Sequence, residues 1–480
     1  MKGIFKTLVI REIQGAIFDF RFWVVLALCV SIIPLSFYVS TRNYSQRLFD
    51  YQQEIQTYKE STQLHAQFSA QGVHPPSPLG IFSQGLGLKM PFKVFTSQDG
   101  NYKIEYARPD SKKDLLGDID FAFIVTFVLS ILAIVFMFNS ISGDKESGVL
   151  RQILANPVLR KQVLMAKLTG NFTVFLAPFI LSLLIALLII YSSNVIPIFT
   201  KELIISVLIM LGISLLFVLM MFNLGLWISA LTRNSILSVN VLLLIWIVLG
   251  LVVPKISPYI GAVIYPVEST GVYESRKALL RQNITKEKEK EERDLFIKIR
   301  SQLRPGEEGV SGQWTDVLSA YDEQVTPILE KYKQLLDYET GQLVNDYTMR
   351  CNKQNAITRN IARLSPMDAV HNLMAEFSCT GFSEADFFLK QAAIYQDYVK
   401  RTYYDKMPIK IYRDEFGMMT KGAGDPSDRP PSELPVLENY KSITPGQIFQ
   451  ENWIDIAILG FYCMLFFVCA FVSFLRFDVR

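Results

Sequence analysis

The stretch FAFIVTFVLSILAIVFMF, residues 121–138, decides the fold of this 480-residue chain. It contains no Asp, Glu, Lys, Arg or His. The hydrocarbon layer of a bilayer is crossed by roughly 20 apolar residues of helix, and a charged side chain at its centre costs about 3 kcal/mol. An uncharged apolar run of this length therefore predicts a transmembrane helix.

Five other stretches of the chain have the same composition. The six predicted transmembrane helices cover residues 22–39, 121–138, 172–190, 203–230, 236–253 and 456–475. Six buried helices of a soluble core are the alternative, but soluble helices are usually polar on one face. We therefore expect an α-helical polytopic membrane protein. Its first span is longer than the apolar region of a signal peptide, so we expect it to be retained.

The composition of the whole chain hides this segregation. Half of the residues are hydrophobic, the mean hydropathy is +0.25 and the net charge is only +3. These values exclude a disordered chain and a small scaffold held by disulfides.

The distribution of Lys and Arg predicts the topology. Twelve of these residues lie in four connections and ends of the chain, at 1–21, 139–171, 231–235 and 476–480. The short connection 191–202 holds only Lys201. Because basic residues concentrate on the cytosolic side, we expect both termini in the cytosol. The membrane is expected to be the inner membrane of a bacterium. Two large segments, 40–120 and 254–455, would then face the periplasm or the exterior.

The two predicted extracytoplasmic segments read as mainly helical with some β structure. Residues 91–107 favour strands, whereas 286–300 and 328–339 have helical patterning. A further helix is expected to begin at Pro366, with Ser365 as its N-terminal cap.

The cysteines and histidines predict little chemistry. Cys351 and Cys379 both lie in the second extracytoplasmic segment, where a disulfide is permitted, but their sequence separation does not fix their distance. Whether they pair is therefore left open. The three histidines are scattered without the spacing of metal ligands, so no metal site is expected.

Several nucleotide-binding and catalytic motifs are missing from the sequence. It has no G-x-x-x-x-G-K-[ST] phosphate loop, no H-E-x-x-H and no G-x-S-x-G. The predicted spans contain none of the ionisable residues that ion-coupled transporters use. Their notable amides, Asn223 and Asn240, suit helix–helix hydrogen bonds. We expect no enzyme activity or cofactor in this chain, and the energy for any transport would come from another protein.

The longest predicted cytosolic connection, residues 139–171, contains a short amphipathic helix over 144–156. Asp144 and Glu146 suit the positive end of the helix dipole, and Pro157 ends the helix. Its apolar face comprises Val149, Leu150, Ile153 and Leu154.

Two interpretations of this helix follow from the residues alone. The apolar ridge, with Arg151 opposite, suits a groove on a cytosolic partner. The helix equally suits the membrane surface, where Arg160, Lys161 and Lys167 would anchor anionic headgroups. Neither interpretation is favoured by the residues.

The same connection resembles the signature of the ABC-2 type transporter permeases. The matching residues are Phe138, Ser142, Gly143, Asp144, Lys145, Glu146, Gly148, Leu150, Pro157, Val158, Arg160, Ala166 and Lys167. The chain departs from the signature at Asn139, Asp144 and Val149. Residues 1–21, with Arg11 and Glu12 beside an apolar stripe, resemble the interfacial elbow helix that precedes the first span in this family.

The resemblance implies the permease subunit of an ABC exporter. Two permease chains, identical or homologous, would sit on two copies of a separately encoded ABC ATPase, and only that partner would bind ATP and Mg. The implied ATPase-coupling residues are Asp144, Lys145, Glu146, Gly148, Leu150, Arg151, Pro157 and Arg160. Membrane lipid and an envelope protein are further expected partners, whereas nucleic acid is not.

The sequence also indicates a class of substrate and leaves two alternative functions. Apolar spans without fixed charge suit a lipid-linked or amphiphilic substrate. A membrane-anchored receptor or scaffold is the main alternative, although an anchor needs neither six spans nor a charged connection. A lipid-interface enzyme is less favoured, since its candidate residues show no motif spacing: Asp118, Asp120, His371 and Asp455.

Overall fold

The computed structural model contains two compact units. Met1–Val252 and Ser365–Arg480 form the first, and Val253–Leu364 form the second. The residues that the structure describes are 2–64, 70–87, 90–96, 102–106, 119–156, 158–195, 200–301, 311–399, 409–413, 419–423 and 442–476.

Among the residues that the structure describes there are six long apolar helices, as predicted. Four of them are uninterrupted α-helices: α2 (Phe20–Leu64), α7 (Arg160–Ser193), α8 (Lys201–Leu231) and α15 (Pro445–Leu475). The other two contain π-helical segments. The first comprises α3 (Phe121–Phe123), η3 (Ile124–Leu129) and α4 (Ser130–Met137), and the second contains α9 (Ser235–Ile247) and η4 (Val248–Val252). The first helix of the bundle is far longer than its apolar part, because α2 continues through a polar sequence to Leu64.

Helix α8 lies at the centre of the first unit, against α4 and α15. Gly225 permits the contact with α4, since a Cβ there would lie 2.6 Å from the Cβ of Met137. Asn223 donates from Nδ2 to the carbonyl of Cys463 on α15 at 3.1 Å, which confirms the predicted helix–helix hydrogen bond. Asn240 is exposed, so the same prediction is wrong for that residue: its face of α9 does not point into the bundle.

A short buried helix, α13 (Pro366–Phe377), packs among these long helices. As predicted, it begins at Pro366, and Ser365 caps it by accepting the Asp368 amide at 3.1 Å. The Ser365 hydroxyl also donates to the carbonyl of Leu249 in η4. Helix α13 contacts both π-helical segments.

The described residues of the first unit also form two small sheets. Strands β1 (Ala70–Val73), β2 (Pro91–Thr96) and β3 (Tyr102–Tyr106) form an antiparallel sheet in that order, with a bulge between Pro91 and Lys93. The single turn η1 (Pro78–Ile81) follows β1, and α14 (Phe382–Val399) packs on the sheet through Phe388 and Val94. Strands β4 (Ile409–Arg413) and β5 (Met419–Ala423) form an antiparallel hairpin.

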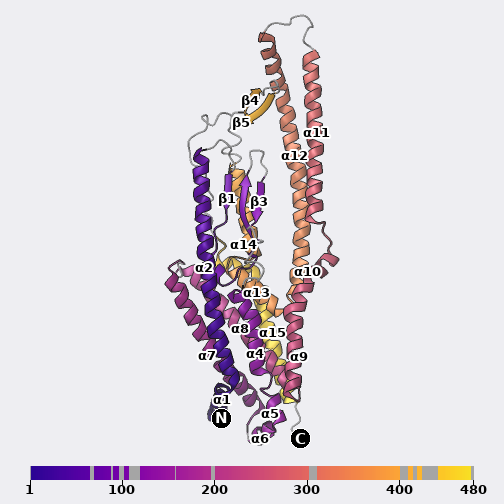
Figure 1. Ribbon diagram of the computed structural model, residues 1–480. Coiled ribbons are helices and arrows are strands. Elements are labelled where there is room, and N and C mark those ends of the chain that lie inside the picture. Colours follow the sequence, from indigo (N-terminus) through magenta and orange to yellow (C-terminus); the bar gives the residue numbers. More distant parts are fainter. Residues whose placement is uncertain are drawn as a thin grey trace. The chain divides into compact units, whose positions relative to one another are not determined.

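The described residues of the second unit form three helices: α10 (Val253–Ile264), α11 (Thr270–Ser301) and α12 (Ser311–Ala362). Figure 1 shows α11 and α12 side by side as a long hairpin. The predicted helices 286–300 and 328–339 are confirmed as parts of this pair. Tyr273 and Tyr347 stack between the two helices with their ring centroids 4.0 Å apart.

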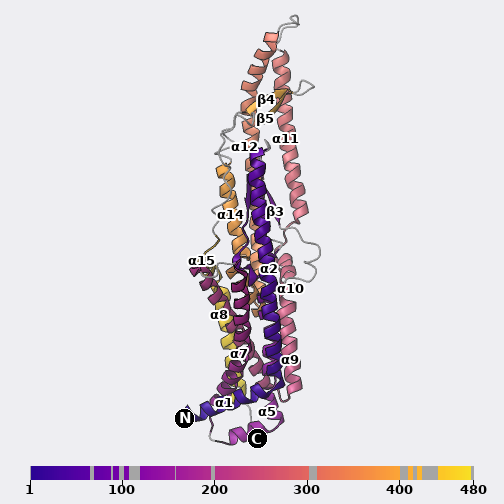
Figure 2. The same cartoon turned by 60° about the vertical axis from the view of Figure 1, so that its left-hand side comes forward.

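Three short or tilted helices gather at one end of the first unit, where the long helices end. They are α1 (Lys2–Phe18), α5 (Ser142–Glu146) and α6 (Val149–Ala155). Figure 2 shows α1 lying across the ends of the long helices, beside α5. We call this the α1/α5/α6 end, and it holds the described residues that the sequence singled out for coupling.

Candidate functional site

The predicted helix 144–156 is two helices, so the prediction of one continuous helix is wrong. The chain breaks after α5 because Gly148 adopts a left-handed conformation with φ of 74°, which glycine tolerates and other residues rarely adopt. The apolar face that was predicted is present on α6, where Leu150 and Ile153 are buried. Arg151 lies on the opposite, exposed side.

Helix α5 is attached to the end of α8 by two side chains. Ser229 Oγ accepts the backbone N–H groups of Ile141 and Ser142 at 2.9 and 3.0 Å and thus caps α5. Lys145 donates from Nζ to the carbonyls of Ala230 and Thr232 where α8 ends. A cation at this position complements the negative end of the helix dipole. Lys145, which was predicted to contact an ATPase, therefore has an internal role.

The next residue, Glu146, attaches α5 to α9. Its carboxylate accepts the Ser235 hydroxyl at 3.0 Å and the Ser235 backbone N–H at 3.3 Å. Ser235 is the first residue of α9, where a negative charge is stabilised by the helix dipole. Lys145 and Glu146 thus bridge the turn between α8 and α9, one at each helix end.

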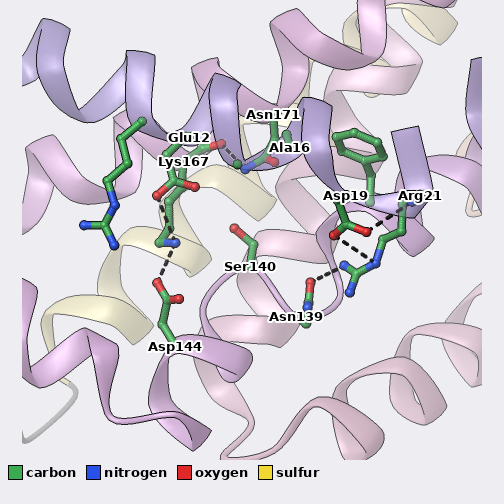
Figure 3. A pocket seen from close by; sticks show the side chains of 12 residues that line it. Glu12, Ala16, Asp19, Arg21, Asn139, Ser140, Asp144, Lys167 and Asn171 are labelled. Atoms are coloured by element: carbon green, nitrogen blue, oxygen red, sulfur yellow. Dashed lines mark hydrogen bonds and ion pairs between the residues drawn. The ribbon is translucent and has the colours of Figure 1, made fainter. Parts of the chain in front are cut away.

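A buried cation joins three further elements at this end. Lys167 of α7 is only 4% exposed, and its Nζ lies 2.6 Å from the Asp144 carboxylate of α5 and 3.3 Å from the Glu12 carboxylate of α1. Figure 3 shows Lys167 between these two acids. The prediction that Lys167 anchors lipid headgroups is therefore wrong, because the two acids occupy its ammonium group.

The contact between α1 and α7 depends on a glycine next to this cluster. A Cβ at Gly170 would lie 2.7 Å from the Cβ of Glu12 and 3.4 Å from the carbonyl oxygen of Val9. The absence of a side chain at Gly170 thus permits the approach of α1 that brings Glu12 to Lys167.

A second polar link connects the start of α2 to the end of α4. Arg21 pairs with Asp19 at 3.5 Å, donates to Asn139 Oδ1 and stacks over the Phe138 ring with 4.7 Å between its guanidinium carbon and the ring centroid. Together with the Lys167 cluster it lines a cleft of about 250 Å³ (Figure 3). The cleft is lined by Arg11, Glu12, Gly15, Ala16, Asp19, Arg21, Phe136, Asn139, Ser140, Asp144, Lys167 and Asn171.

The remaining residues that were predicted to couple to an ATPase do not take part in the contacts around α5. Arg160, at the start of α7, donates to the carbonyl of Leu475 at the end of α15 at 2.7 Å. Arg11 is exposed on α1 and contributes to the cleft. Pro157 lies outside the described residues. The prediction did not include Ser229, Arg21 or Gly170, which are ordinary residues in the sequence and acquire their role only through contacts with distant segments.

The candidates for other chemistry do not form a site. Cys351 and Cys379 are both free thiols, and Cys379 is buried where α13 ends. Burial raises the pKa of the Cys379 thiol, which disfavours the thiolate needed for disulfide exchange. Asp120 caps α3 through the Phe123 amide at 2.7 Å, and Asp118 lies outside the described residues. Within the part of the chain that the structure describes, no group of three or more His, Cys, Asp or Glu could hold a metal ion.

Comparison with known proteins gives one result. The family model described as "ABC-2 family transporter protein" matches residues 7–479, which covers the six apolar helices and both large insertions. No curated protein matches the chain.

Proposed function

Because the chain belongs to the ABC-2 family of transporter proteins, we propose that it is the permease subunit of an ATP-driven exporter whose ATPase docks on α5 and α6. Permeases of this family are multi-pass membrane proteins without an ATPase domain, and they generally pair with ABC ATPase subunits. Membership of the family does not give the docking surface, the direction of transport or the kind of substrate, and the proposal concerns these three properties.

The observation that carries the docking proposal is the set of contacts around α5. This five-residue helix is joined to α8 by Lys145, to α9 by Glu146 and to α7 by the ion pair of Asp144 with Lys167. Lys167 in turn donates to Glu12 of α1. A movement of α5 imposed by an ATPase would therefore act on the ends of three long helices at once. Such a rigid attachment suits the transmission of force better than it suits a loop that only connects two spans.

The distribution of exposed residues on α6 supports the proposal that the ATPase docks at this end. Its apolar residues Leu150 and Ile153 are buried, so this face is not available to lie on lipid. Arg151, Gln152 and Ala155 are exposed on the other side. The ATPase would contact this polar edge, while the apolar face transmits the contact to the bundle.

The proposed assembly contains two permease chains, identical or homologous, on two ATPase subunits. ATP and Mg would bind only to the ATPases. The α1/α5/α6 end would face the cytosol of a bacterium from its inner membrane, consistent with the Lys and Arg of these segments. The second unit and the small sheets would face the periplasm or the exterior, where they would receive an envelope partner.

The proposed substrate is a lipid-linked or amphiphilic molecule. The supporting observation is that the apolar stretches predicted as spans carry no fixed charge. A polar or ionic cargo would need compensating groups at membrane depth, whereas an amphiphile keeps its apolar part among apolar helices.

The docking proposal is tested by adding a charged side chain to the edge of α6. Ala155→Arg keeps a good helix former and removes no side-chain contact, since Ala155 is exposed. With the partner ABC ATPase co-expressed, we expect the variant to lose permease-dependent ATP hydrolysis at normal membrane levels. The matched control is Ala356→Arg on the exposed side of α12, which should hydrolyse ATP like the parent. Unchanged hydrolysis by Ala155→Arg would exclude this docking surface.

A further inference from the structure

The cleft at the α1/α5/α6 end contains charges that do not balance locally (Figure 3). Lys167 carries one positive charge, whereas the carboxylates of Asp144 and Glu12 that pair with it carry two negative charges. These three side chains therefore leave one negative charge in excess. Because Lys167 is buried and both acids are only partly exposed, water and salt screen this excess incompletely.

Acceptor atoms beside the excess charge have no donor in the protein. Asp144 and Glu12 each contact Lys167 through one carboxylate oxygen, and no described residue donates to their second oxygens. The Ser140 hydroxyl is buried and has no hydrogen-bond partner among the described residues. Figure 3 shows Ser140 between the Lys167 cluster and Arg21. Since buried hydroxyl groups usually have a partner, a ligand in the cleft would complete this arrangement.

An unpaired positive charge lines the same cleft. The guanidinium group of Arg11 makes no hydrogen bond or ion pair with a described residue, and Arg11 adjoins Glu12 on α1. Arg21, the other arginine of the cleft, is already paired with Asp19 at 3.5 Å. The charges of the lining residues therefore cancel in total, but one positive and one negative charge have no partner. Such a lining suits a ligand that is itself a zwitterion.

We propose that the cleft binds an ethanolamine phosphodiester, which carries one primary ammonium group and one negatively charged phosphate. The ammonium group has three N–H donors, and Asp144, Glu12 and Ser140 present three acceptors to it. The single charge of the phosphodiester matches that of Arg11, whose guanidinium group suits phosphate oxygens. The cleft volume of about 250 Å³ equals that of about eight water molecules, which is enough for this ligand but not for a drug-sized one.

Two molecules supply this chemistry, the headgroup of phosphatidylethanolamine and the soluble compound glycerophosphoethanolamine. Either one would link elements that are distant in the sequence, because Arg11 lies on α1 and Ser140 lies between α4 and α5. The binding requires neither an ATPase nor transport. Its failure would therefore leave the proposed function unaffected.

The test counts the ligands that stay bound to the purified full-length protein in native mass spectrometry. Phosphatidylethanolamine is compared with phosphatidylcholine, and glycerophosphoethanolamine with glycerophosphocholine. The choline compounds keep the phosphodiester but have no N–H donor, so they control for the ammonium contacts. Arg11→Gln removes the phosphate partner and Ser140→Ala removes the hydroxyl acceptor. Lys6→Gln removes the same charge from an exposed position of α1 outside the cleft and is the matched control.

We expect the parent and Lys6→Gln to retain an ethanolamine compound at least fivefold better than its choline counterpart. Arg11→Gln and Ser140→Ala should lose most of this preference. A preference for the lipid alone supports the proposal with a phospholipid as the ligand, and a preference that extends to glycerophosphoethanolamine supports it with a soluble ligand.

Equal retention of the ethanolamine and choline compounds by the parent would overturn the proposal. A preference that persists in both Arg11→Gln and Ser140→Ala would also overturn it, because the ligand would then bind elsewhere. The two substitutions lie on different elements, so either one keeps the test decisive if the other prevents folding.

Discussion

The ammonium group of Lys167 lies 2.6 Å from the carboxylate of Asp144, and Lys167 is buried, with only 4% of its surface exposed. This ion pair attaches the helix proposed to receive the ATPase to α7, and the second acid, Glu12, extends the attachment to α1. A signal that arrives at α5 thus has a path into the bundle that does not depend on the covalent connection through α6.

Removal of the buried cation should weaken this end of the protein. In Lys167→Met two carboxylates lose their partner, which costs 3–5 kcal/mol in a fully buried pair and about 2 kcal/mol here, because both acids remain partly exposed. Thermal unfolding of the purified protein should show a lower Tm. Lys161→Met, at an exposed position on the same helix, is the control and should unfold like the parent. Equal Tm values for the two variants would contradict the assigned role of Lys167.

The glycine beside Glu12 should be required for the docking of α1. The added Cβ of Gly170→Ala would push against Glu12 and Val9 at a cost of about 1–3 kcal/mol. We expect α1 to detach more often and trypsin to cleave faster after the exposed Arg11. Gly212→Ala on α8 adds the same methyl group where nothing lies within 4 Å, and it should leave cleavage unchanged. Identical cleavage of the two variants would argue against a tight α1–α7 contact.

Asn223 and Asn240, the two asparagines in the apolar helices, should contribute differently to the stability of the protein. Asn223→Ala removes the hydrogen bond from α8 to Cys463, and hydrogen bonds between membrane helices are worth about 0.6 kcal/mol on average. With the small cavity that is left, we expect a loss of about 1 kcal/mol in a detergent unfolding titration. Asn240→Ala is the matched control, because Asn240 is exposed and should tolerate the change. The reverse order of effects would contradict the orientation of α9.

The two cysteines outside the apolar helices should react at different rates. Burial, together with the carboxylates of Glu384 and Glu376, raises the pKa of the Cys379 thiol. Since the thiolate is the reactive form, alkylation of Cys379 at pH 8 should be slow until the protein is unfolded, and it should rise only at more alkaline pH. Cys351 is only partly buried and should be alkylated in the native protein. Mass spectrometry without reductant measures both rates, and a linked Cys351–Cys379 peptide would refute the free-thiol assignment.

The parts of the fold that the sequence predicted are those that a local rule determines. Uncharged runs such as 121–138 must be helical in a bilayer, because the backbone has no other partner for its hydrogen bonds. The cap at Ser365 followed from the Ser-Pro pair, and it is present. The apolar face of α6 was likewise readable from the spacing of Leu150 and Ile153.

The parts that were missed depend on contacts between distant segments. Residues 144–156 have the same apolar spacing in one helix as in two, so the break at Gly148 had no signal beyond the glycine itself. A lysine near a span end reads as a headgroup anchor, and only the folded chain brings Asp144 and Glu12 to Lys167. The contacts of Lys145 and Glu146 with the turn between α8 and α9 were not predicted for the same reason, since their partners lie more than 80 residues away in the sequence. Their role in docking stays a prediction.

The most direct test of the central proposal places a photo-crosslinking amino acid at Gln152, on the exposed edge of α6. A second variant carries it at Asn360 on α12, which the proposed topology puts on the opposite side of the membrane. After illumination of native membranes that contain both subunits, the account predicts a crosslink to the ATPase from position 152 and none from position 360. A crosslink from position 360, or none from position 152 while the two subunits still purify together, would contradict the account.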